Sequence, residues 1–90
     1  MKIEIGFSSS FKRVFKKRIR GNEKLEPRFW ERLEKFAKNP FYPTLRTHKL
    51  SGELDELWSF NVEYDCRVIF KFLGENRVLL IDIGTHDEVY

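Results

Sequence analysis

Two histidines and one arginine are the residues of this sequence best suited to acid–base chemistry. His48 lies in the stretch RTHKLSG, and His86 lies in the closing stretch LLIDIGTHDEVY, which ends at Tyr90. Imidazole has a pKa near neutrality, so it can give or take a proton under physiological conditions. Arg67 lies in an apolar run, where a guanidinium either pairs with carboxylates or binds a phosphate. A solvated or capping side chain is the common alternative for a loop histidine such as His48.

The composition indicates a single globular domain, residues 1–90. Ninety residues do not suffice for two hydrophobic cores, and 41% hydrophobic with 16% aromatic residues exceeds the disordered range. The lone Cys66 excludes an internal disulfide, and no cysteine–histidine spacing matches a zinc site. The chain shows no signal peptide and no long apolar run, which favours a cytoplasmic protein without membrane contact. A net charge of +3 permits an anionic partner.

The N-terminal half predicts a short strand and two helices. Alternating isoleucines indicate a strand over residues 2–6, and the serines at 8–10 can cap a helix over roughly 9–20. Pro27 suits the first turn of a second helix that extends to residue 38. Each helix has one apolar face, and the short connection between them predicts an antiparallel helical hairpin.

Three further strands are predicted at 57–63, 67–73 and 77–83, where apolar and polar residues alternate. The expected fold is therefore α+β. The short N-terminal strand and these three strands form a four-stranded, mostly antiparallel sheet, and the helical hairpin packs on one of its faces. We expect Ile69, Val78 and Leu80 on the other, partly open face.

Matching the apolar faces of the strands predicts their register. Val62 is expected opposite Val68, with residues 64–66 as the loop, and Arg67 is then flanked by Glu63 and Asp82. From this pattern alone Arg67 is either the centre of an ion-pair network or a phosphate ligand.

The predicted topology also places the possible acid–base groups. The strand over 77–83 should end beside the loop at 64–66, which would bring His86 and Tyr90 near Asp65. His48 can join them only if its own loop folds back over the sheet.

Three stretches together, THKLSG, WSFNVEYDCRVIFKF and LLIDIGTHDEVY, resemble the RelE/ParE superfamily of type II toxins. The resemblance is closest to the YafQ-like mRNA interferase branch. It covers residues 44–90 most clearly, and the β-α-α start agrees with it. It implies a RelE-like fold and a ribosome-dependent mRNA endonuclease that needs neither a metal nor another cofactor. Such an enzyme uses the RNA's own 2′-hydroxyl as the nucleophile, with a base, an acid and a cation supplied by the protein.

The resemblance assigns roles position by position. It implies catalytic roles for four residues, His48, Asp65, Arg67 and His86. It implies substrate contacts for three others, which are Tyr90 against the base, Asn61 and Lys49.

Four positions depart from the family pattern, and three of the departures remove positive charge. Asn61 stands where the YafQ branch has histidine and the RelE branch has lysine. Ser59 replaces a second lysine of the RelE branch, Asp82 replaces an arginine, and Cys66 replaces a tryptophan. These departures predict a slowed or retuned ribonuclease.

The resemblance also implies partners and leaves alternatives open. The expected partners are an acidic, partly disordered cognate antitoxin, mRNA in the ribosomal A site, and operator DNA only through the antitoxin complex. A ParE-like gyrase inhibitor without catalysis is one alternative. A catalytically weakened RelE-like binding protein is the other, and the two histidines with Arg67 favour the endonuclease.

Overall fold

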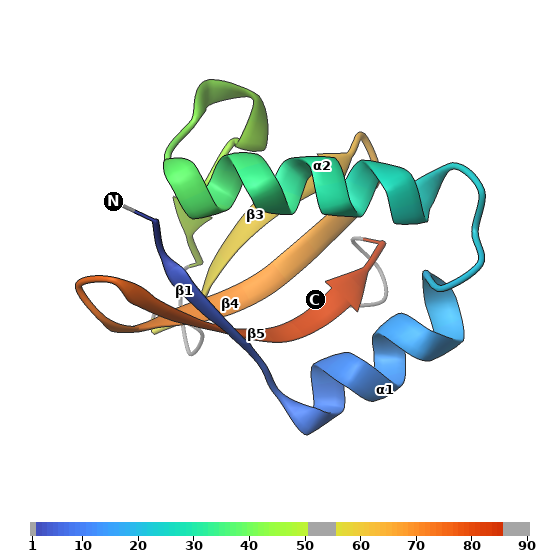
Figure 1. The fold of residues 1–90 in the computed structure, drawn as a ribbon, viewed down its shortest axis with the longest axis horizontal. Helices are drawn as coiled ribbons and strands as arrows, with labels where there is room; N and C mark the ends of the chain where they lie inside the picture. Colours follow the sequence, from blue (N-terminus) through green and yellow to red (C-terminus); the bar gives the residue numbers. More distant parts are fainter. Residues whose placement is uncertain (1, 51–55, 86–90) are drawn as a thin grey trace.

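The protein is described by a computed structural model for residues 2–50 and 56–85. Two helices lie on a twisted sheet (Figure 1), so the α+β prediction is confirmed. The elements in chain order are β1 (Glu4–Phe7), α1 (Ser9–Arg18), α2 (Leu25–Lys38), a single 3₁₀ turn η1 (Pro43–Leu45), β2 (His48–Lys49), β3 (Trp58–Glu63), β4 (Cys66–Gly74) and β5 (Arg77–Gly84).

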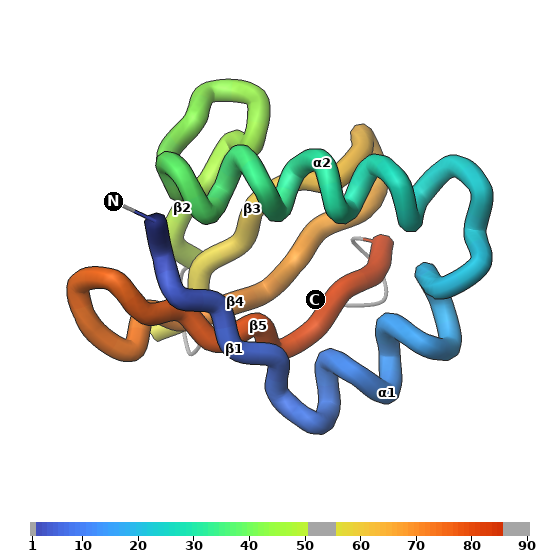
Figure 2. Tube along the Cα trace, viewed as in Figure 1, coloured from blue at the N-terminus to red at the C-terminus, as the bar shows by residue number. Residues whose placement is uncertain are grey.

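The sheet has five strands in the order β1-β5-β4-β3-β2, one more than the sequence predicted. β1 runs parallel to β5, and the other neighbours are antiparallel. The additional strand, β2, has only two residues, too few for an alternating pattern to be visible in the sequence. It brings the chain that follows α2 back to the edge of the sheet beside β3 (Figure 2).

The helix ends are set by local hydrogen bonds. The Ser8 hydroxyl accepts from the Phe11 N–H at 3.0 Å and caps α1, as the serine run predicted. Gly21 adopts a positive φ of 82° just beyond the helix, which turns the chain. α2 begins before Pro27 because the Asn22 side chain accepts from the N–H groups of Lys24 and Leu25.

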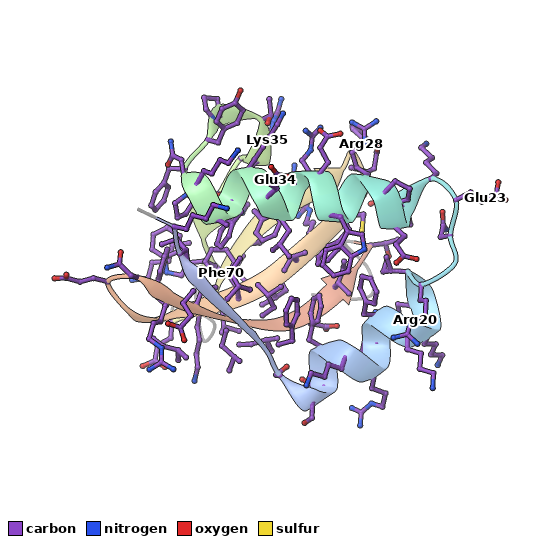
Figure 3. All side chains as sticks on the ribbon, viewed as in Figure 1. Arg20, Glu23, Arg28, Glu34, Lys35 and Phe70 are labelled. Carbon is purple, nitrogen blue, oxygen red and sulfur yellow. The ribbon has the colours of Figure 1, made fainter. Side chains whose placement is uncertain are left out.

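The hydrophobic core lies between the helices and the sheet. Phe36 of α2 has no exposed surface, and its ring lies 4.6 Å from that of Phe60 and 4.9 Å from that of Phe70. Figure 3 shows Phe70 beneath α2, whereas Glu34 and Lys35 point away from the core. Among the described residues, no helix is long and apolar enough to cross a membrane.

The predicted register between β3 and β4 was wrong by two residues. Phe60, and not Val62, lies opposite Val68, and an irregularity between Asn61 and Glu63 interrupts the pairing. The sequence pattern could not distinguish these registers, because a shift of two keeps the same faces together. The irregularity pairs Glu63 with Cys66 and turns its carboxylate toward α2.

The open face is also less apolar than expected. Val78 and Leu80 belong to the core, with 1% and 0% of their surface exposed, so their assignment to the open face was wrong. The β4–β5 pairing shifts between Ile69 and Phe70, which breaks the strict alternation on which that prediction depended. Ile69 lies on the face away from the helices, between Ser59 and Asp82 on the neighbouring strands.

Candidate functional site

A polar groove of about 460 Å³ lies where α2, η1 and the β3–β4 turn meet. We call it the arginine groove. Its lining residues are Arg32, Thr44, Arg46, Asn61, Val62, Glu63, Tyr64, Asp65 and Arg67. Three arginines from separate parts of the chain therefore line one hollow, together with two acidic residues, Glu63 and Asp65. Such an arrangement attracts phosphate groups.

Arg67 occupies the middle strand of the sheet, but its neighbours differ from those predicted. It lies opposite Asn61 on β3 and opposite Gly84 on β5. The Glu63 carboxylate pairs instead with Arg28 of α2, with Nε and Oε1 2.9 Å apart. Arg67 therefore lines the groove without the two directly opposed carboxylates that the sequence suggested.

Asp82 lies one diagonal step from Arg67, because it is paired with Ile69. Its Oδ1 accepts a hydrogen bond from the N–H of Ile83 at 2.8 Å. Asp82 is not among the residues that line the arginine groove. The acidic departure from the family pattern is thus placed beside the groove and outside its lining.

His48 lies at the edge of the sheet, because the chain that follows α2 returns there and forms β2. Its main chain pairs with Ser59 of β3. The His48 Nδ1 atom lies 2.9 Å from the Arg46 carbonyl oxygen, and Nε2 lies 3.4 Å from the Ser59 hydroxyl. Since Arg46 lines the arginine groove, an exposed imidazole adjoins that groove.

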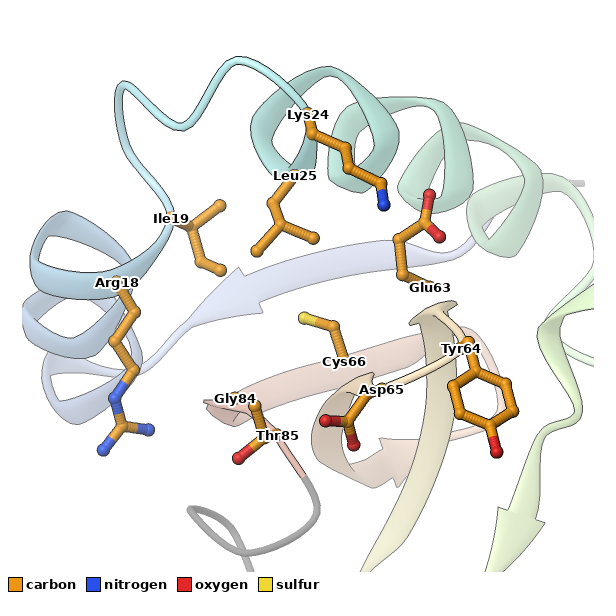
Figure 4. A pocket seen from close by; sticks show the side chains of 10 residues that line it. All are labelled: Arg18, Ile19, Lys24, Leu25, Glu63, Tyr64, Asp65, Cys66, Gly84 and Thr85. Atoms are coloured by element: carbon orange, nitrogen blue, oxygen red, sulfur yellow. The ribbon is translucent and has the colours of Figure 1, made fainter.

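Asp65 stands in the two-residue turn between β3 and β4, next to Tyr64, of which 95% is exposed. The same turn borders a second hollow of about 450 Å³, which we call the Cys66 hollow (Figure 4). In Figure 4 the thiol of Cys66 points into this hollow from beneath Ile19 and Leu25. Asp65 is therefore exposed between two depressions of opposite character, one rich in arginine and one largely apolar.

The end of β5 lies at the same place. Gly84 and Thr85 line the Cys66 hollow together with Tyr64 and Asp65, which confirms that this strand ends beside the turn. Two of the predicted site residues, His86 and Tyr90, lie outside the described residues, and their roles stay predictions.

The two remaining predicted substrate contacts, Asn61 and Lys49, lie in different places. Asn61 lines the arginine groove opposite Arg67. Lys49 follows His48 on β2 and therefore points to the other side of the sheet, where it lines a separate hollow with Trp58 and Phe72. The structure does not bring Lys49 together with the arginine groove.

Sequence reasoning missed Arg32 and Arg46. Arg32 lies on the polar side of the second predicted helix, and Arg46 lies in the stretch RTHKLSG, and neither was assigned a role. The signal that the sequence offered was the position of Arg46, two residues before His48. The backbone conformation that directs the Arg46 carbonyl toward His48 could not be predicted, because no glycine marks a left-handed residue there. Within residues 2–50 and 56–85, no group of three or more histidine, cysteine, aspartate or glutamate side chains could hold a metal ion.

The family is decided by a match over almost the whole chain. Residues 3–90 match the family model described as the bacterial toxin of a type II toxin–antitoxin system, YafQ. The chain belongs to the YafQ toxin family. It is thus a toxin of the type II class, as the three sequence stretches suggested. A comparison with curated proteins returned no match.

Solved structures share the fold of this YafQ-family chain. YafQ from E. coli strain BL21(DE3) superposes with a TM-score of 0.80 at 18% identity, with 99% of both chains covered. The E. coli DinJ–YafQ toxin–antitoxin complex gives 0.79 at 18% identity, with 100% of this chain and 99% of the other covered. A YoeB/ParE toxin from Agrobacterium tumefaciens gives 0.76 at 16% identity, with 93% and 99% covered.

Proposed function

We propose that this YafQ-family toxin is an mRNA endonuclease that acts in the ribosomal A site. The 2′-oxygen of a nucleotide attacks the adjacent phosphorus while a base removes the 2′-hydroxyl proton. The bond between phosphorus and the 5′-oxygen breaks, and an acid protonates the departing oxygen. A guanidinium stabilises the extra negative charge on the phosphoryl oxygens during this step. The products are a 2′,3′-cyclic phosphate and a 5′-hydroxyl.

The observation that carries the proposal is that Arg46 and Arg67 line one groove, while the His48 ring contacts the Arg46 carbonyl oxygen next to it. These residues come from an edge strand, the end of η1 and a central strand. Their imidazole and guanidinium groups are the types that proton transfer and phosphate binding require. Asp65, from the β3–β4 turn, adds a carboxylate at the rim of the same groove. A gyrase inhibitor that acts by binding alone does not need this acid–base set.

The charge balance of the groove supports retained activity despite the departures from the family pattern. Asn61 and Asp82 remove positive charge from positions where relatives carry it, but Asp82 lies outside the groove lining. Arg32 and Arg46 contribute two cations from α2 and η1, so that with Arg67 three arginines face the two acidic lining residues, Glu63 and Asp65, and Glu63 is itself paired with Arg28. We propose that these two arginines bind the RNA backbone beside the scissile phosphate, which Arg67 contacts.

An antitoxin partner is also part of the proposal, because the structurally similar E. coli YafQ is found in a complex with DinJ. The exposed side of α1 carries Lys12, Arg13, Lys16 and Lys17, and the helix has no acidic residue. An acidic, partly disordered antitoxin segment suits this surface. Operator DNA would be reached only through the antitoxin complex.

A largely apolar hollow beside this cationic surface offers an anchor point for the antitoxin, and it is lined by Phe7, Phe11, Lys12, Phe15, Arg20, Phe29 and Trp30. Trp30 is 48% exposed. Its indole N–H donates to the Glu26 carboxylate at 3.2 Å, and its ring packs edge-on against those of Phe15 and Phe29. A fixed, half-exposed tryptophan is a common centre of binding energy at protein interfaces. The open face of the sheet offers less apolar surface for antitoxin binding than expected, since Val78 and Leu80 are buried in the core.

Expression of the toxin alone, followed by primer extension on one message, tests the endonuclease. The message is supplied in two copies, one with and one without a start codon. We expect growth arrest and cleavage of the translated copy only. Growth arrest with intact message and altered plasmid supercoiling would instead establish the gyrase mechanism. Absence of arrest in a folded protein would favour the weakened binding protein.

A further inference from the structure

Arg46 has an unusual backbone conformation. Among residues 2–50 and 56–85 it is the one non-glycine residue with a positive φ, at φ 49° and ψ 43°. This left-handed region is disfavoured for residues that carry a Cβ atom. Such conformations persist where the surrounding structure enforces them, and they cluster at functional sites.

The neighbours of Arg46 supply that enforcement. Leu45 is fully buried in the core and anchors the turn. The Arg46 N–H donates to the Pro43 carbonyl at 3.2 Å, and the Thr47 hydroxyl donates to the Pro40 carbonyl. The chain is thus held on both sides of Arg46, and the direction of its carbonyl group is set.

That carbonyl points at His48. Its oxygen lies 2.9 Å from Nδ1, and a carbonyl oxygen can only accept a hydrogen bond, so Nδ1 must carry the hydrogen. In the neutral ring, Nε2 then has a free lone pair. The Ser59 hydroxyl lies 3.4 Å from Nε2 and can donate to it from the adjacent strand. The contacts of both ring nitrogens therefore fit the Nδ1–H tautomer, in which Nδ1 donates and Nε2 accepts.

We propose that Arg46 is a positioning residue that selects the Nδ1–H tautomer of His48 through its left-handed main chain. Nε2 is then the nitrogen that takes the proton from the 2′-hydroxyl, while the new bond forms between the 2′-oxygen and phosphorus. The resulting imidazolium keeps its hydrogen bond from Nδ1–H to the Arg46 carbonyl oxygen. The role in proton transfer rests on the proposed endonuclease, whereas the tautomer does not.

Two substitutions separate the main chain of Arg46 from its side chain. Arg46→Asn and Arg46→Val both remove the guanidinium from the groove. Asparagine tolerates the left-handed conformation, whereas β-branched valine strongly disfavours it. A difference between the two variants therefore reports the backbone, and their common loss relative to the wild type reports the guanidinium.

The tautomer is read directly by two-bond ¹H–¹⁵N correlation NMR at pH 8, where an ordinary histidine is neutral. A His86→Gln background leaves a single imidazole, that of His48. We expect the Nδ1–H pattern in the Arg46 parent and in Arg46→Asn, and a loss of that pattern in Arg46→Val. An Nε2–H pattern in the parent overturns the proposal. So does an unchanged Nδ1–H pattern in a folded Arg46→Val.

Cleavage by otherwise wild-type chains provides the second measurement. We expect single-turnover cleavage by Arg46→Val to be at least about 10²-fold slower than by Arg46→Asn, since a wrong tautomer disables a histidine base. Equal rates contradict the positioning role. If Arg46→Val does not fold, the parent's tautomer decides alone. If the parent has the Nδ1–H tautomer but never cleaves RNA, the endonuclease fails and the assignment of the tautomer stands.

Discussion

Glu63 and Arg28 form an ion pair across the β3–α2 contact, with Oε1 and Nε 2.9 Å apart. The sequence suggested instead that Glu63 would face Arg67 from the neighbouring strand. The pair with Arg28 gives the carboxylate at the end of β3 a cationic neighbour on α2. Arg67 lines the arginine groove and lies opposite Asn61 on β3.

Arg67→Ala should therefore lower the cleavage rate far more than it lowers the melting temperature. Loss of one group that stabilises transition-state charge typically costs about 10²–10³ in rate. The side chain is partly buried, with its Nε atom out of contact with solvent, but it is not part of the apolar core. Ribosomal cleavage and thermal unfolding, measured on the same preparation, test this expectation.

Arg28→Ala is the matched control, since it removes the partner of Glu63 on the helix side. Its side chain is 41% exposed, and partly exposed pairs contribute only about 0.2–1 kcal/mol. We expect a small drop in melting temperature and an unchanged cleavage rate. A variant of Arg67 that unfolds like a core mutant would show that Arg67 is structural.

Phe36→Ala should be among the most destabilising single changes in α2. The ring is fully buried between Phe60 and Phe70, so its removal leaves a cavity. Truncation of a buried phenylalanine costs about 3–5 kcal/mol. Urea unfolding measures the loss. Phe41→Ala, at a ring that is 54% exposed, should cost clearly less, and equal losses would contradict the described core.

Much of this architecture could be predicted from the sequence, because periodicity reports which face of an element is buried. The apolar faces of both helices and of β3 lie where the pattern placed them. Register is a different matter, since a two-residue shift leaves the pattern unchanged. A bulge, in contrast, adds a single residue and inverts the faces beyond it. Bulges in β3 and β5 put Glu63, Val78 and Leu80 on the opposite side of the sheet from the one expected.

The residue types of the proposed site could be named from the sequence, whereas their geometry could not. His48, Asp65 and Arg67 were proposed from three short stretches that resemble a family. Arg32 and Arg46 were not, because they converge on the groove only through tertiary packing. The link between Arg46 and His48 depends on a left-handed turn that non-local contacts enforce.

The linker between the helices should give stability that depends on pH. The backbone N–H of Gly21 donates to Glu26 at 2.8 Å, and the Trp30 indole donates to the same carboxylate. These hydrogen bonds hold the pKa of Glu26 below its ordinary value, with the Gly21 bond as the larger cause. A lowered folded-state pKa stabilises the fold above the unfolded pKa, and this stabilisation is lost as the pH falls through the folded one.

Glu26→Gln should accordingly lower the melting temperature at pH 7, and the difference from wild type should shrink below about pH 4. Glu23→Gln, an exposed position in the same linker (Figure 3), is the control. Melting curves at several pH values test both variants. A difference that stays constant from pH 7 to pH 3 would contradict the role of the ionised carboxylate.

His48→Gln should preserve the fold and reduce cleavage by about 10²–10⁴, the usual cost of losing a general acid or base. The side chain is exposed on an edge strand, so little packing is lost. Single-turnover cleavage and circular dichroism test this. Lys38→Gln, on the exposed side of α2, is a neutral reference. Wild-type cleavage by folded His48→Gln would leave Asp65 and His86 as the acid–base groups.

His86→Gln should show the same pattern if His86 is the second proton-transfer group. Removal of Tyr90 should instead weaken the placement of the base more than the chemical step, because an aromatic ring contributes stacking, worth about 1–3 kcal/mol per base. Saturating and subsaturating cleavage measurements separate the two effects. If folded His86→Gln cleaves at the wild-type rate, the acid–base set must rest on His48 and Asp65.

The arginine groove makes a prediction about salt. Each phosphate contact that the groove provides should contribute about 0.7 to the slope of log affinity against log salt for single-stranded RNA. Arg32 lines the groove from α2, and Arg32→Gln should lower both the affinity for a short RNA and this slope by about one contact. Arg77→Gln removes an equal charge from the far end of β5 and should lower the affinity less. Equal effects of the two substitutions would mean that the RNA responds to net charge alone, and the groove would lose its assignment as the path of the backbone.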